Sequence, residues 1–475
     1  MTEERTPSSP APTPNKSGWG ARIVYLLVIL VTGVAGAGIT ALLLNIQERK
    51  WEGQQRFVKV VDLSEETIDP TVWGQNFPRQ YDSYKLTVDS ERTAHGGSDA
   101  MPPDKLKKFP YLKKLFAGYA FSIDFRELRG HAYMLKDQEK TKRVTERKQP
   151  GACLHCHASV LPAYREAGNG DIMKGFEKVC AMTWTDARKL VKHPVSCIDC
   201  HDPKTVQLRV TRPAFLNGID SLAKSDYELP HFPSIERWRK RKQSDNYDPN
   251  ELASRQEMRS FVCAQGHVEY YFAKDTKAVT YPWANGLEIE QIEKYYDDIS
   301  FHDWKHKITG TSMLKAQHPE FEMWNQGIHA RKGVSCADCH MPYKREGAIK
   351  VSDHRVRSPM LNVARACQVC HREEEKQLVA TVDRIQGKTK KLIDRTGYIV
   401  EGLIGDIESA QDRSVAEELI NKARQFHRKA QWRLDYVLSE NSVGFHASQE
   451  YARILAESID FARQGQLVLR PNTKK

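Results

Sequence analysis

The ten cysteines of this 475-residue chain constrain its fold more than any other feature. Eight of them fall into four strings of the form Cys-x-x-Cys-His. Two thiols at this spacing can add to the two vinyl groups of one haem, and the imidazole that follows can bind its iron. Each string therefore predicts one covalently attached haem. The predicted attachment and axial residues are Cys153, Cys156, His157, Cys197, Cys200, His201, Cys336, Cys339, His340, Cys367, Cys370 and His371.

Zinc sites and disulfide bonds are the other uses of paired cysteines. A histidine directly after each of the four pairs argues against zinc. Thiols three residues apart in a turn make poor structural bridges in a chain of this length. Haem is therefore the interpretation that the pattern favours.

A fifth string, Cys263-Ala-Gln-Gly266-His267, keeps the first thiol and the histidine but has glycine in place of the second thiol. We predict that it holds the third haem in chain order through a single thioether bond at Cys263, with His267 as axial ligand. An empty site is the alternative. The tenth cysteine, Cys180, stands alone and is predicted to be a packed thiol.

The N-terminal region contains an uncharged stretch at residues 23–46, which is long enough to span a bilayer. We predict a retained transmembrane anchor at residues 22–47 that follows a disordered, Pro- and Ser-rich tail at residues 1–21. A cleaved signal peptide is the alternative, although its apolar core would be shorter. Because c-type haems are attached outside the cytoplasm, the rest of the chain is expected on the periplasmic or outer side of the cytoplasmic membrane.

The formal net charge of +11 raises the question of an anionic partner. Lys and Arg are interleaved with Asp and Glu along the chain, and no nucleic-acid-binding motif is present, so we expect no nucleic acid partner. A basic cleft raises the local concentration of small anions. The charge therefore favours an anionic substrate.

The chain divides into a loop-rich region and a region of long amphipathic stretches, and a mainly α fold is expected. Residues 51–372 are loop-rich and carry all five haem strings, so they form the predicted pentahaem catalytic region. Residues 373–468 contain long amphipathic stretches without proline and predict long helices. This C-terminal region either packs on the haem core as a bundle or forms a dimer contact, and the sequence does not separate the two.

The chain has seventeen histidines, which determine how many haem irons can have both axial positions filled and so be closed to substrate. A haem that only transfers electrons needs a second strong ligand on its iron. Five haems with four such ligands would leave one iron open to substrate. The predicted second ligands are His131, His329, His354 and His446. We assign to structure or to the surface His95, His155, His193, His231, His302, His306 and His427.

Two segments between the haem strings carry a family resemblance. Cys263-Ala-Gln-Gly-His-Val-Glu-Tyr-Tyr and Lys315-Ala-Gln-His-Pro-Glu resemble the pentahaem, ammonia-forming cytochrome c nitrite reductases, and the likeness extends over about residues 55–465. The resemblance implies a calcium ion bound by Glu269, Gln317 and the carbonyls of Tyr270 and Lys315. It also implies the substrate-facing residues Arg143, Tyr270 and His318.

The resemblance further assigns the second axial ligands. His131 would face the third haem, His354 the second, His446 the fourth and His329 the fifth, which leaves the first haem open. The axial residue of that first haem is His157, whereas many members of the family have lysine there. Rate and potential are therefore not transferred from the family to this chain.

The expected activity is the six-electron reduction of nitrite to ammonium. Arg143 and His318 are suitable donors to the nitrite oxygens, and Tyr270 can donate a hydrogen bond or a proton. We also expect a homodimer, fed by a membrane cytochrome that oxidises quinol or by another electron donor. The alternatives are an electron-transfer cytochrome in which every iron is closed, and an enzyme that converts hydroxylamine or sulfite.

Overall fold

The computed structural model describes residues 18–53, 59–127, 129–241, 245–347 and 349–470, and these residues are mainly helical. The chain divides into two units, residues 1–58 with 345–350 and residues 59–344 with 351–475. The first unit contains helix α1 (Gly18–Gly53), which includes an apolar span at Gly18–Glu48 with a mean hydropathy of 2.4. The helix begins at Gly18, within the predicted tail, whose residues 1–17 lie outside the described part. By length and composition, α1 can serve as a membrane anchor or as a signal sequence.

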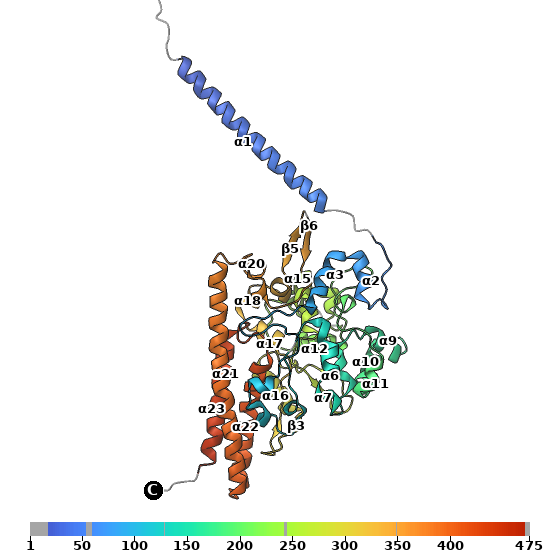
Figure 1. Cartoon of the computed structure of the whole chain (residues 1–475), viewed down its shortest axis with the longest axis vertical. Coiled ribbons are helices and arrows are strands. Elements are labelled where there is room, and N and C mark those ends of the chain that lie inside the picture. The colour runs from blue at the N-terminus through green and yellow to red at the C-terminus, as the bar shows by residue number, and fades with distance from the viewer. Residues whose placement is uncertain (1–17, 54–58, 128, 242–244, 348, 471–475) are drawn as a thin grey trace, which may run out of the picture. The chain divides into compact units, whose positions relative to one another are not determined.

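The second unit begins with short helices joined by loops (Figure 1). Up to residue 189 they are α2 (Pro70–Asn76), α3 (Pro78–Lys85), α4 (Lys105–Lys108), α5 (Leu112–Leu115), α6 (Met134–Lys140), α7 (Lys142–Thr145), α8 (Leu154–His157), α9 (Leu161–Ala167), α10 (Ile172–Ala181) and α11 (Trp184–Lys189). Those that follow are α12 (Pro213–Lys224), α13 (Pro233–Arg239), α14 (Pro249–Leu252), α15 (Arg255–Ala264), α16 (Ile289–Asp298), α17 (Glu320–Asn325), α18 (Ile328–Arg331), α19 (Cys336–His340) and α20 (Val363–Ala366).

Helix α15 illustrates how local sequence sets these starts. The Ser254 side chain accepts a hydrogen bond from the backbone N–H of Glu257, and the Glu257 carboxylate accepts one from the Ser254 N–H, which forms a capping box. The buried residues Met258, Phe261 and Ala264 then recur at helical spacing. Capping and burial together fix the helix that carries Cys263, the thiol of the third string in chain order.

Three two-stranded sheets complete this part of the fold. β1 (Tyr271–Phe272) pairs with β2 (Val279–Thr280), with Tyr271 opposite Thr280. β3 (Trp304–Lys305) pairs with β4 (Ser312–Met313), with Trp304 opposite Met313. β5 (Tyr343–Glu346) pairs with β6 (Ile349–Ser352). The first two hairpins flank the segments that contain Tyr270 and Lys315, so they determine where those segments lie.

The C-terminal region forms three long helices, α21 (Glu375–Asp412), α22 (Glu417–Ser439) and α23 (Ser448–Val468), which pack on one another (Figure 1). Residues 373–468 contain no proline to interrupt them. Ile393, Val400, Leu403 and Ile407 of α21 are buried at helical spacing. The prediction of a mainly helical fold with long C-terminal helices is confirmed.

Among the described residues, buried apolar side chains form two clusters. One joins residues 106–125 to α16 and to the three long helices. The other lies around α9, α10, α12 and α15 and includes Cys180, which is fully buried. Cys180 is therefore a packed thiol, as predicted.

Candidate active site

Each cysteine string forms a single helical turn. In the second, third and fifth strings, the backbone N–H of the histidine donates to the carbonyl of the first cysteine, at 2.9, 3.1 and 2.9 Å respectively. The fourth string forms α19, and in the first string Cys153 is the N-cap of α8, which contains Cys156 and His157. A helical turn brings the histidine beside the thiols, on the same side of the chain. A cavity of about 470 Å³ at the fifth string is lined by Cys370 and His371.

Four of the five string histidines face a second imidazole. The distances between ring centres are 6.4 Å for His131 and His267, 6.2 Å for His201 and His354, 6.5 Å for His340 and His446, and 6.3 Å for His329 and His371. Two imidazoles that bind opposite faces of one iron, each at about 2 Å, have ring centres roughly 6 Å apart. The spacing therefore fits a haem iron between each pair.

Hydrogen bonds orient several of these imidazoles. The Nδ1–H groups of His157, His201 and His340 donate to the carbonyls of Met134, Val206 and Arg357 at 2.9, 2.9 and 3.0 Å. This leaves Nε2 as the free nitrogen for a metal. Burial lowers the pKa of each of these three histidines to about 4, which keeps the ring neutral as ligation requires. The residues present therefore fit c-type haem.

His157 differs from the other string histidines, because in the described part of the chain no histidine ring faces it at such a distance. Its electrostatic neighbours include Arg143, His318 and Asp137. Arg143 lies on α7 with its guanidinium 4.1 Å from the centre of the Phe121 ring. Tyr270 interacts electrostatically with both thiols of the first string, Cys153 and Cys156. The three predicted substrate residues thus gather around the first string.

Two of these residues carry unsatisfied polar atoms. Arg143 Nε and His318 Nδ1 are buried and have no hydrogen-bond partner among the described residues. A buried polar atom without a partner costs about 1–3 kcal/mol, so such atoms point to a group that is bound there. Burial lowers the pKa of His318 to about 3. The site therefore combines a guanidinium with a neutral imidazole, an arrangement suited to a small anion.

The predicted calcium ligands also lie together. The backbone N–H of Gln317 donates to Glu269 Oε2 at 2.6 Å, and the Gln317 side-chain amide donates to the Lys315 carbonyl at 3.3 Å. Glu269 is fully buried, and burial raises its pKa well above the usual range. Calcium binds carboxylate, carbonyl and amide oxygens, and a cation would restore the charged carboxylate. These residues therefore fit calcium. Within the described residues no three His, Cys, Asp or Glu side chains form a metal cluster, so backbone and amide oxygens would complete this set.

The structure adds residues that sequence reasoning missed. Asp303 and Asp435 both hydrogen-bond to the segment that precedes His318. Tyr119 stacks on Trp304 at 4.5 Å and interacts electrostatically with Arg143. Asp435 had a usable signal, because it is a charged residue within the apolar run 434–438 of α22. For Tyr119 and Asp303 we find no such signal.

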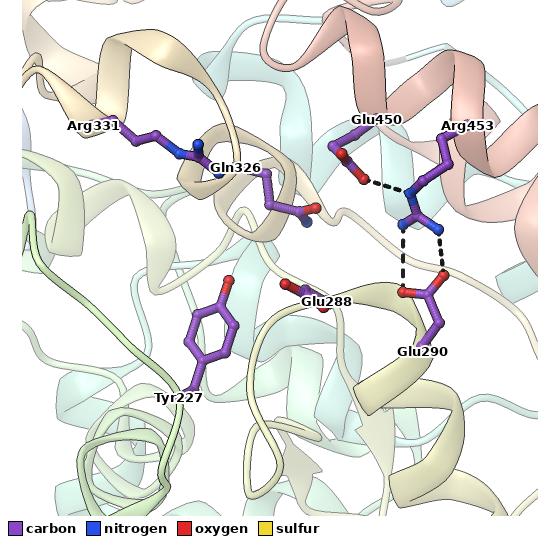
Figure 2. A pocket seen from close by; sticks show the side chains of 7 residues that line it. All are labelled: Tyr227, Glu288, Glu290, Gln326, Arg331, Glu450 and Arg453. Atoms are coloured by element: carbon purple, nitrogen blue, oxygen red, sulfur yellow. Dashed lines mark hydrogen bonds and ion pairs between the residues drawn. The ribbon is translucent and has the colours of Figure 1, made fainter.

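A separate surface recess of about 360 Å³ has a different character (Figure 2). Arg453 donates to Glu450 at 2.8 Å and to Glu290 at 2.7 Å, as the dashed lines show. Glu288 and Arg331 complete its charged lining. Its Arg453 guanidinium is already paired with carboxylates, in contrast to the Arg143 Nε, which has no partner among the described residues.

A chain that sets imidazoles at iron spacing beside cysteine strings is a multihaem c-type cytochrome, and its fold provides several such places. It belongs to the cytochrome c552 family, whose model matches residues 69–475. The family predicted from the sequence is thereby confirmed.

Known relatives cover most of the chain. The cytochrome c-552 of Parabacteroides distasonis is 36% identical over 400 residues, which are 82% of this chain and 74% of the relative. That of Porphyromonas gingivalis is 33% identical over 459 residues, 95% of this chain and 84% of the relative. The catalytic subunit of the Desulfovibrio desulfuricans cytochrome c nitrite reductase, a structure with two calcium sites, aligns with a TM-score of 0.71 and 29% identity over 86% of this chain and 87% of that one.

Proposed function

We propose that this cytochrome is an ammonia-forming nitrite reductase that acts outside the cytoplasm. One observation carries the proposal: four string histidines face a second imidazole, whereas Arg143 and His318 lie near His157 and Tyr270 lies near the thiols of the same string. The family relationship to a nitrite reductase of known structure supports it. Converting nitrite to ammonium consumes six electrons and eight protons, which a multihaem chain with one open site suits.

Bound haem would supply an open iron at the first string and a route for electrons through the other four. The protein's own residues bind and orient the anion. The Nε–H of Arg143 donates to one nitrite oxygen, and the neutral imidazole of His318 donates to nitrite from Nδ1. The Tyr270 hydroxyl, whose pKa burial raises well above its ordinary value, stays protonated and can give a hydrogen bond or a proton.

A calcium ion forms part of the proposal. Glu269, Gln317 and the carbonyls of Tyr270 and Lys315 would hold it, since these are hard oxygen ligands. The contacts between Gln317 and both Glu269 and Lys315 support this set. A cation there adds positive charge near an anionic substrate and ties His318 to the chain segment of Tyr270.

The third haem is proposed to be attached by one thioether bond, from Cys263, between His267 and His131. The Cys263 thiol adds across one vinyl group, so that an S–C bond forms and the thiol proton moves to the neighbouring vinyl carbon, with no net oxidation. Gly266 has no positive φ, and a Cβ placed on it meets nothing within 4 Å. Glycine is therefore not needed for the backbone there. The intact helical turn and the 6.4 Å ring pair support a retained haem.

Intact-protein mass under denaturing conditions tests this attachment. We expect five covalent haems, together with a minor component in the pyridine haemochrome spectrum that reflects one unreacted vinyl group. Gly266→Cys should remove that component without changing the haem count, because the site has room for a side chain. A mass that accounts for only four haems would contradict the proposal.

The remaining parts of the proposal concern partners and location. Helix α1 is proposed to be a retained anchor that holds the catalytic part at the outer face of the cytoplasmic membrane. There it can receive electrons from a cytochrome that oxidises membrane quinol. The long C-terminal helices are proposed to form a homodimer contact, for which exposed Tyr398, Leu419 and Leu467 are candidates.

The activity is tested with the purified holoprotein, reduced dye and nitrite, with ammonium quantified against electrons consumed. We expect one ammonium for six electrons, and a high-spin ferric signal that changes when nitrite is added. Parallel assays with hydroxylamine and sulfite rank the substrates. Spectra showing every iron low-spin and unaffected by nitrite would identify an electron-transfer cytochrome instead.

A further inference from the structure

Three consecutive backbone amides in the segment before His318 donate to three different carboxylates. The Lys315 N–H donates to Asp303 Oδ2 at 2.8 Å, and the Ala316 N–H donates to Asp435 Oδ2 at 2.8 Å. The Gln317 N–H donates to Glu269 Oε2 at 2.6 Å. Hydrogen bonds to carboxylates are shorter and stronger than those between neutral groups. The segment is therefore held by carboxylates from three separate parts of the chain.

Asp435 contacts the segment through both of its carboxylate oxygens. It lies on α22, and its Oδ1 accepts from the Lys315 ammonium at 2.9 Å. Both side chains are only 1% exposed. Ser439, one helical turn later, donates to the Ala316 carbonyl at 3.1 Å and contacts the Lys315 ammonium at 3.0 Å. A buried ion pair keeps its geometry only when further hydrogen bonds complete it, as they do here.

The two ends of this segment are proposed functional groups. The Lys315 carbonyl is a proposed calcium ligand, and His318 is a proposed donor to nitrite. His318 in turn interacts electrostatically with His157 of the first string. A displacement of about 1 Å in a catalytic group can lower a rate by about a hundredfold. Holding the backbone between these groups therefore matters to both.

We propose that Asp435 and Asp303 are positioning residues that fix the Lys315 carbonyl and His318 by binding the intervening backbone. This inference rests on the proposed function and extends it to α22, which contributes a residue to the site from the C-terminal helices. Asp435 orients the calcium-binding carbonyl and the imidazole together, so its loss should affect calcium retention and nitrite turnover in parallel.

The test is Asp435→Asn, which keeps the size of the side chain but leaves the Lys315 ammonium without its counter-charge. We expect the haem count to remain at the wild-type value, the calcium content after dialysis to fall by at least half, and kcat for nitrite to fall at least tenfold. Added calcium should restore part of the rate. The matched control is Asp460→Asn, an exposed aspartate of α23 that accepts a hydrogen bond from the Gln464 side chain.

Calcium content and the high-spin ferric signal are measured without nitrite, so they test Asp435 even if the wild type does not reduce nitrite. If Asp435→Asn loses haem, Ser439→Ala and Asp303→Ala decide, because Ser439→Ala removes two contacts to the same segment and Asp303→Ala removes one. We expect severalfold losses of calcium retention in both. Wild-type calcium content, wild-type kcat and an unchanged high-spin signal in a haem-replete Asp435→Asn protein would overturn the proposal.

Discussion

His318 owes its neutral state to burial, which lowers its pKa to about 3. A neutral imidazole carries one N–H, and the Nδ1 of His318 has no partner in the described part of the chain. Glu320, two residues later, lies 4.0 Å from that nitrogen, too far for a hydrogen bond. The ring is therefore free to donate to a bound anion without first giving up an internal bond.

His318→Ala and Tyr270→Phe should each lower nitrite turnover by about a hundredfold or more, because each removes a donor aimed at the developing negative charge. Steady-state kinetics on haem-counted protein gives the measurement. His302→Ala, an exposed histidine, is the control and should retain wild-type turnover. Unchanged turnover in either site variant at full haem content would remove that residue from the site.

Individual site residues could be predicted from the sequence where the residues that act together are neighbours in the chain. Each string places its thiols and its first ligand within five residues, so His157 and His267 could be read directly from the chain. His131 and His446 were candidates for second ligands from the sequence, but the haem that each would face came only from the family resemblance. Asp303 and Asp435 were not predicted, because they reach the same backbone segment from loops and helices that only the folded chain brings together.

Helix α22 buries a polar side chain, His427, in addition to its apolar residues. His427 is fully buried, and its Nε2–H donates to Gln431 Oε1 at 3.0 Å. Its Nδ1 lies 3.1 Å from the hydroxyl of Thr311 and 3.3 Å from that of Thr309. His306 is its titratable neighbour, at 5.1 Å between ring centres. Burial and the His306 charge lower the pKa of His427 to about 3.

The buried His427 of α22 leads us to predict that the folded protein loses stability in mild acid. The pKa of His427 is about 3 in the folded protein, below the unfolded value of about 6.5, so the unfolded chain binds the extra proton first. The contribution is present above about pH 6.5 and is lost as pH falls, by about 2 kcal/mol between pH 7 and pH 5. Thermal unfolding of wild type and His427→Gln at both pH values should show a smaller pH effect in the variant. His302→Gln should behave as the wild type, and equal pH effects in all three would contradict the assignment.

The long helices could be predicted from the sequence, since a proline-free amphipathic stretch leaves few alternatives. Their junctions could not: α21 ends at Asp412 and α22 begins at Glu417 without a glycine or proline between them. The short helices of residues 70–366 were not predicted individually, because the sequence indicated only a loop-rich region there. Several contain four or five residues, too few for hydrophobic periodicity to reveal.

On the scale of the whole molecule, α1 is distinct in composition from the rest of the chain. Its 36 residues include an apolar span whose side chains are exposed in the described part of the structure. A helix of that composition is stable in lipid, where all of its backbone groups are satisfied internally. An anchor and a cleaved signal would place the protein differently, and only the first keeps it on the membrane.

Membrane fractionation distinguishes these two fates. We expect the mature protein to remain in the membrane fraction through high salt and to be released only by detergent, because about twenty apolar residues hold a helix in the bilayer essentially irreversibly. N-terminal sequencing should find residues of α1 still present. A soluble protein beginning near residue 40 would show that the segment is a signal. Deleting residues 1–50 behind a cleavable signal should leave nitrite turnover unchanged.

The apolar cluster that unites residues 106–125 with the C-terminal helices also bears on the order of folding. Leu112 and Phe116 pack in the same cluster as Leu403, Tyr436 and Leu455, although most of the chain lies between them. Closing so long a loop is slow, and a chain threaded from its N-terminus cannot form this cluster until its last helices have emerged. All of the cysteine strings precede those helices, so each of them emerges before this cluster can close.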